Sequence, residues 1–248
     1  MSSAPDSPLA EWLARNNRLM VIASIAVLTL LAWGYLTGGA GMATGAIAKP
    51  TLVITMWWVM MIAMMLPSAA PAILLYGRVQ RQSRGAAAIG PSWLFLLGYL
   101  LAWLGFSLVA ARAQLALVGS GWVDPMALRA TADHFAGAAL IAAGAYQLSP
   151  WKNACLSQCR SPAAFISRHW RPGASGAVRL GLLHGATCIG CCWLLMVLLF
   201  VGGVMNLVWV AALAALVAIE KIARRGALFG RTVGAIMLVL GAVVLVVG

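Results

Sequence analysis

One segment of the chain carries the residues best suited to chemistry. It reads Gly-Leu-Leu-His-Gly-Ala-Thr-Cys-Ile-Gly-Cys-Cys-Trp and spans 181–193. In a helix, His184, Cys188 and Cys192 fall at i, i+4 and i+8 and share one face, with Cys191 beside them. Imidazole and thiolate are soft-to-borderline donors that suit copper, zinc or mercury. The spacing favours metal or redox chemistry, although buried cysteines can also pack as small apolar residues.

A second pair of thiols, Cys155 and Cys159, lies in the string Trp-Lys-Asn-Ala-Cys-Leu-Ser-Gln-Cys-Arg. The i, i+4 spacing suits one face of a short helical turn. Nearby Lys152 and Arg160 should lower the pKa of both thiols and raise their thiolate content. We expect this pair at the cytoplasmic surface, close enough to the 181–193 segment to form one soft-metal site with it. Two sulfurs around a shared ion would lie within about 8 Å of one another. The alternative is two unrelated surface thiols.

A third candidate is a ladder of methionines in the string Met-Trp-Trp-Val-Met-Met-Ile-Ala-Met-Met-Leu-Pro. Met56, Met60 and Met64 recur at one-turn steps, and thioether sulfur favours Cu(I). Methionine is also a flexible filler of apolar packing, and packing is the favoured interpretation of the ladder taken alone. Pro67 and Pro71 should kink this helix and free backbone carbonyls beneath the ladder.

The elements that must position these residues are membrane helices. Of the 248 residues, 63% are hydrophobic and only 9% are charged, against about 25% charged in a soluble domain. Several apolar runs reach the roughly 20 residues that cross a bilayer. We therefore predict an all-α polytopic bundle of about seven helices, embedded in lipid as one transmembrane domain over 19–248 after a cytoplasmic segment over 1–18. The spans expected are 19–36, 52–76, 93–118, 132–148, 178–201, 205–220 and 232–247. Gly202 and Gly203 should separate the fifth span from the sixth.

The charges orient this bundle. The net charge of +12 does not indicate nucleic-acid binding, because the basic residues sit in short clusters between apolar runs. Of the 17 basic residues, 14 fall on one side of a seven-helix layout: Arg15, Arg18, Arg78, Arg81, Arg84, Lys152, Arg160, Arg168, Arg171, Arg179, Lys221, Arg224, Arg225 and Arg231. Basic loops face the cytoplasm, which predicts a multi-pass protein of the bacterial inner (plasma) membrane, N-terminus in and C-terminus out. Glu220 is expected to pair with adjacent Lys221 at the membrane interface.

Three strings together carry a family resemblance: the methionine ladder, the segment from Tyr146 to Cys159, and the segment from His184 to Trp193. They resemble a bacterial family of uncharacterised, predicted metal-binding integral membrane proteins, over most of the span from about 50 to 225. The resemblance implies a membrane fold and a bound metal. The two pairs of cysteines also look like those of mercuric-ion uptake proteins, which are smaller and have fewer helices.

The residues favour a soft-metal protein, with copper first and zinc or mercury as further options. Transport, delivery or homeostasis would move the ion between the methionine ladder and the cysteine and histidine cluster. A partner for delivery would be a membrane protein or a metallochaperone. An enzyme is less favoured, although Cys188 and Cys191 form a CxxC pair that a membrane thiol-disulfide oxidoreductase would use. A non-catalytic subunit of a membrane complex is the third hypothesis.

Overall fold

The structure is a computed structural model that describes residues 8–39, 49–84 and 89–247. Residues 1–7 of the predicted N-terminal segment and 85–88 of a predicted cytoplasmic loop lie outside the described residues. The described elements are α1 (Pro8–Thr37), α2 (Pro50–Arg84), α3 (Ile89–Gly119), α4 (Asp133–Leu148), α5 (Pro150–Arg160), α6 (Pro162–His169), α7 (Gly173–Val197), α8 (Leu199–Gly202), α9 (Leu207–Ile222) and α10 (Gly226–Val247). Every one of them is a helix, which confirms the all-α prediction.

Five of these helices are long and apolar enough to cross a membrane: α1, α2, α3, α7 continuing into α8, and α10. They match five of the seven predicted spans. The other two spans correspond to α4 and α9, which have 16 residues each. At 1.5 Å per residue each is about 24 Å long, shorter than a bilayer core of about 30 Å. Seven crossings therefore stay a prediction, and the first predicted boundary, at residue 18, falls inside the continuous α1.

Proline residues begin the short helices near the cysteines, and a glycine ends α8. Pro150 and Pro162 stand at the first turns of α5 and α6. The N–H that proline lacks would have no partner within the helix at this position. The Ser149 hydroxyl caps α5 by accepting a hydrogen bond from the Lys152 N–H at 3.2 Å. At the far end of α8, Gly203 adopts a φ of +92°, which an L side chain rarely tolerates. The predicted interruption at Gly202 and Gly203 is confirmed, and it separates α8 from α9.

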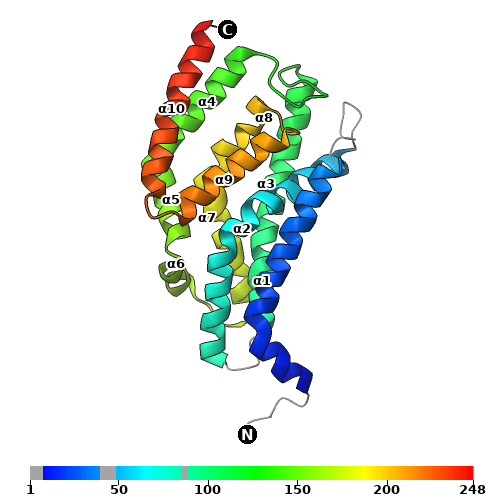
Figure 1. Cartoon of the computed structure of the whole chain (residues 1–248), viewed down its shortest axis with the longest axis vertical. Coiled ribbons are helices and arrows are strands. Elements are labelled where there is room, and N and C mark those ends of the chain that lie inside the picture. Colours follow the sequence, from blue (N-terminus) through cyan, green and yellow to red (C-terminus); the bar gives the residue numbers. More distant parts are fainter. Residues whose placement is uncertain (1–7, 40–48, 85–88, 248) are drawn as a thin grey trace.

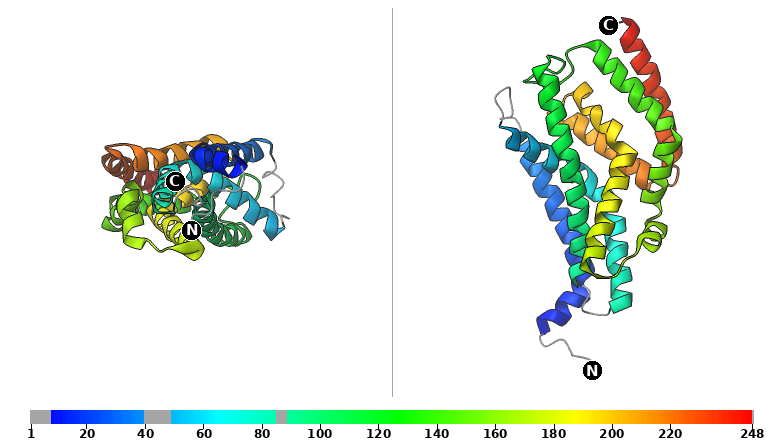
Figure 2. Two further views of the ribbon diagram at one scale, coloured as in Figure 1. Left: turned by 90° about the horizontal axis from the view of Figure 1, so that it is seen from below. Right: turned by 180° about the vertical axis from the view of Figure 1, so that it is seen from behind.

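Glycines let two pairs of helices approach closely. In the α3–α7 pair, a Cβ on Gly98 would collide with the Val178 carbonyl, and one on Gly181 with the Phe95 carbonyl. In the α4–α10 pair, a Cβ on Gly144 would lie 2.7 Å from the Gly234 carbonyl oxygen. Small residues at such crossings are typical of helices that pack in lipid. Figure 2 shows both pairs side by side, and the α3–α7 contact fixes the helix that carries three of the cysteines.

The helices alternate between the two ends of an elongated bundle (Figure 1). The start of α1 and the end of α10 lie at opposite ends. In between, α2 packs against α1, α3 and α9, and it changes direction along its length. Pro67 and Pro71 lie inside α2, and proline is the usual cause of such a bend. The cysteine-bearing segments α5 and α7 pack against each other beside this bend.

Candidate metal centre

The predicted stripe on the 181–193 segment faces the interior of the bundle. His184, Cys188, Cys191 and Cys192 all lie on α7 and expose at most 3% of their surface. All the cysteines are free thiols. The helical spacing therefore places one imidazole and three thiols in the protein interior, away from lipid.

Two thiols of α7 share one backbone acceptor. Both the Cys191 and the Cys192 thiols donate to the backbone carbonyl oxygen of Cys188, each at 3.0 Å. Among the described residues, no three His, Cys, Asp or Glu side chains are arranged to hold a metal ion together. A four-ligand site of the zinc type is therefore not preformed, whereas two thiolates are enough for Cu(I).

Cys188 occupies a polar contact point between four helices. Its sulfur lies 2.8 Å from the Lys221 ammonium nitrogen of α9 and 3.3 Å from the Tyr99 hydroxyl of α3. The same ammonium donates to the Ser68 hydroxyl of α2 at 3.1 Å. Tyr99 in turn donates to the Met65 carbonyl of α2 at 3.1 Å. Sequence reasoning missed Ser68, Tyr99 and Lys221, because each comes from a helix far from Cys188 in the chain.

The two thiols of α5 both reach α7. Cys159 lies close enough to Cys191 for the two thiols to interact electrostatically. The Cys155 sulfur lies 3.0 Å from where a Cβ on Gly190 would stand, so the missing side chain of this glycine makes room for it. Both α5 thiols are partly buried rather than lying open at the surface as expected. The structure thus brings the two predicted groups of cysteines together.

The expected effect of neighbouring basic residues on the α5 thiols is wrong. Burial raises the pKa of Cys155, with a smaller contribution from Cys191. The hydrogen bond with Cys191 raises the pKa of Cys159, and burial adds to it. The nearby cations are engaged elsewhere: Arg160 donates to backbone carbonyls at the end of α9, and Lys152 binds a carboxylate. A basic residue close in sequence need not lower a thiol pKa when its side chain is directed to other groups.

A cavity of about 270 Å³ joins the two groups of cysteines. Cys159 of α5 and both His184 and Cys188 of α7 line it, together with Ser68 and Lys221. Its volume exceeds what one ion requires, so the ion and its ligands have space to rearrange. Cys155, Cys191 and Cys192 are not among the lining residues.

His184 is the lining residue with unused bonding capacity. Its ring sits among Phe95, Tyr99 and Phe165, with ring-centre distances of 5.8, 5.9 and 5.2 Å. Its Nδ1 atom is buried and has no hydrogen-bond partner among the described residues. A buried polar atom without a partner costs free energy. A soft metal in the cavity would supply the missing partner, so the donor set fits copper.

The predicted pairing of Glu220 with adjacent Lys221 is wrong. Glu220 binds Lys152 at 2.6 Å, with both side chains only 2% exposed, and it accepts a hydrogen bond from Gln147 at 2.7 Å. Successive residues of a helix point about 100° apart, so the two neighbours face different helices. Glu220 turns toward α4 and α5, and Lys221 turns toward Cys188.

The methionine ladder lies in the core. Met56, Met60 and Met64 expose 2% or less of their surface, and their neighbours Met61 and Met65 are as deeply buried. The described residues that line the cavity include no methionine. Burial is compatible with packing and with metal passage alike, so the role of the ladder stays a prediction.

Comparison with known proteins gives one match. The model of the family described as PpoB2, copper chaperone, matches residues 54–244. This region contains all five cysteines, His184 and the methionine ladder. No curated protein and no solved structure matches the chain.

Proposed function

The chain belongs to the PpoB2 copper chaperone family, and from that premise we propose that it binds Cu(I) inside a membrane-embedded helical bundle and passes the ion on. In this proposal copper is the ion that the protein transfers, and not a permanently bound cofactor. The family match supports copper over zinc or mercury, and the apolar helices support a membrane location.

The carrying observation is the cavity that Cys159, His184 and Cys188 line together. We infer that the sulfurs of Cys159 and Cys188 bind the ion as thiolates, with His184 Nδ1 as a third donor. Cys191 interacts with Cys159 and is placed to exchange the ion with it. Cys192 would hold or receive an ion after it leaves the cavity.

The buried methionines suggest a path for Cu(I) between the cavity and the far end of α2. On α7, Met196 lies two turns beyond Cys188 and is 1% exposed. One turn later Phe200 contacts Trp57 of α2, with ring centres 5.6 Å apart. Trp57 follows Met56, the first member of the ladder. Lys221 contacts α2 and α7 at one end of this path. The contact between Trp57 of α2 and Phe200 of α8 marks the other end. We infer that the methionine thioethers lie between these two ends. We propose that Cu(I) moves along these sulfurs to or from the cavity.

The test is copper binding by the purified full chain in detergent. Under reducing, oxygen-free conditions, Cu(I) is offered in competition with a chromogenic Cu(I) chelator. We expect Cys188→Ser and Cys159→Ser each to lower the Cu(I) affinity by about tenfold or more, because a hydroxyl is a harder and weaker ligand for Cu(I) than a thiolate.

Cys155→Ser is the matched control, since this thiol lies on the same helix as Cys159 but outside the cavity. It should leave the first Cu(I) affinity unchanged. If the native chain binds no Cu(I), or if all these variants bind it equally well, the proposed function is wrong.

A further inference from the structure

Lys221 is a buried cation without a carboxylate partner in the part of the chain that the structure describes. It is 8% exposed at the end of α9. No carboxylate among the described residues forms an ion pair with it, because adjacent Glu220 is taken by Lys152. Its ammonium instead contacts Ser68 and, at 2.8 Å, the sulfur of Cys188. A buried charge is costly unless an opposite charge lies near it.

The charge of an occupied site supplies that opposite charge. The cavity is lined by two thiols, Cys159 and Cys188, and by the neutral donor His184. When a metal binds, both thiol protons leave to solvent and two thiolates remain. Two thiolates and one Cu(I) carry a net charge of −1, which the Lys221 ammonium balances. The same donors around Zn²⁺ are neutral, and Lys221 would then leave an uncompensated charge of +1.

We propose that Lys221 is the counter-charge of the thiolate site and makes it selective for monovalent soft ions over divalent ions. This inference rests on the proposed function and assigns its ion preference to a residue that does not itself bind the metal. The neighbouring buried lysine does not have this role, because the carboxylate of Glu220 neutralises Lys152 at 2.6 Å.

The decisive variant is Lys221→Met, which keeps the length of the side chain and removes its charge. The purified full chain in detergent is titrated with Cu(I), Ag(I) and Zn²⁺, each in competition with a chelator of known affinity. We expect Lys221→Met to weaken Cu(I) and Ag(I) binding by about tenfold or more. Zn²⁺ binding should stay the same or become stronger. The ratio of monovalent to divalent affinity therefore falls by about tenfold or more.

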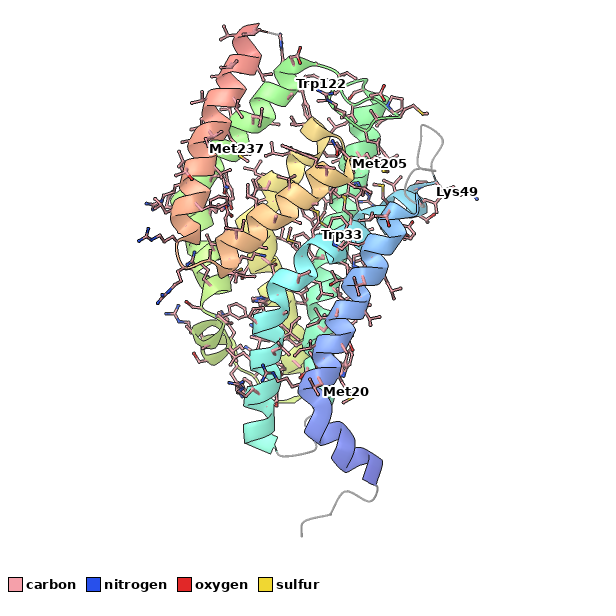
Figure 3. All side chains as sticks on the ribbon, viewed as in Figure 1. Met20, Trp33, Lys49, Trp122, Met205 and Met237 are labelled. Carbon is pink, nitrogen blue, oxygen red and sulfur yellow. The ribbon has the colours of Figure 1, made fainter. Side chains whose placement is uncertain are left out.

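Three further variants separate charge from structure. Lys221→Arg keeps the charge and should restore most of the native ratio. Lys221→Gln is measured in parallel, so that misfolding of one neutral variant does not remove the test. Lys49→Met makes the same substitution at an exposed residue at the far end of the bundle from Met20 (Figure 3), and should behave as the native chain.

The outcomes separate the two proposals. If both neutral variants keep the native preference for monovalent ions, the proposal that Lys221 is the counter-charge is wrong. An equal loss of affinity for all three ions would also contradict it and would indicate a structural role for Lys221. If the native chain binds neither Cu(I) nor Ag(I), the proposed function fails and the counter-charge fails with it.

Discussion

At the scale of a single side chain, a substitution at His184 can distinguish metal binding from packing. Its ring is enclosed by aromatic residues, while its Nδ1 atom is buried without a partner among the described residues. A phenylalanine would keep the ring contacts and remove the unsatisfied atom. Stability and copper binding should therefore respond in opposite directions.

We predict that His184→Phe raises the free energy of unfolding by about 1 kcal/mol or leaves it unchanged, because an unpaired buried polar atom is removed. The Cu(I) affinity should fall by about tenfold, since one donor is lost. Thermal unfolding and chelator competition measure the two effects. His134→Phe, at an exposed position of α4, is the control. Native copper affinity in His184→Phe would remove His184 from the site.

The methionine ladder can be tested with little damage to packing. Replacing Met56, Met60 and Met64 with leucine keeps volume and apolarity, which usually costs less than about 1.5 kcal/mol per site. We expect normal expression and a slower transfer of Cu(I) into or out of the protein in vesicles. Met237→Leu makes the same change at a buried position of α10, away from α2 (Figure 3). If the triple variant transfers copper at the native rate, the ladder is packing.

At the scale of helices, the Lys152–Glu220 ion pair joins α5 to α9 and so holds Cys159 beside Lys221. Gly230 of α10 makes room for this pair, since a Cβ there would lie 2.7 Å from a Glu220 carboxylate oxygen. Breaking a buried pair leaves one charge without compensation, which is more costly than removing both charges.

We predict that Glu220→Gln lowers the free energy of unfolding by about 3–5 kcal/mol, because Lys152 is then buried alone. The double variant Lys152→Met with Glu220→Gln should recover most of this loss. Denaturant unfolding of the single and double variants in detergent gives the comparison. A double variant less stable than Glu220→Gln alone would show that the pair itself, rather than the stranded charge, accounts for the loss.

The sequence predicted the long elements well and the polar contacts poorly. Periodic apolar runs and the break at Gly202 and Gly203 depend on local chemistry, so the helices could be read from the chain. The approach of Cys159 to Cys191 was expected in outline from their common membrane side. The contacts of Lys221 could not be predicted, because they depend on the angle at which α9 crosses α2 and α7. Only a structure reveals which of two neighbouring charged residues turns toward a thiol.

At the scale of the whole molecule, the start of α1 and the end of α10 lie at opposite ends of the bundle (Figure 1). An odd number of membrane crossings stays a prediction from the distribution of basic residues. We predict that a reporter fused after residue 248 is active outside the cytoplasm, and that one inserted at 85–88 is active inside it. The insertion is the internal control for expression and orientation. A cytoplasmic C-terminus would contradict the proposed orientation, N-terminus in and C-terminus out.

The position of the Arg160 guanidinium bears on whether the protein could conduct protons. It donates to the carbonyl oxygens of Glu220, Ala223 and Arg224, so the end of α9 needs no water to satisfy these groups. A file of water through a membrane protein conducts protons, and a fixed positive charge beside a pore repels them. Arg160 also lines the cavity. We expect that, in a membrane-spanning bundle, a polar cavity lined by Arg160 would not conduct protons.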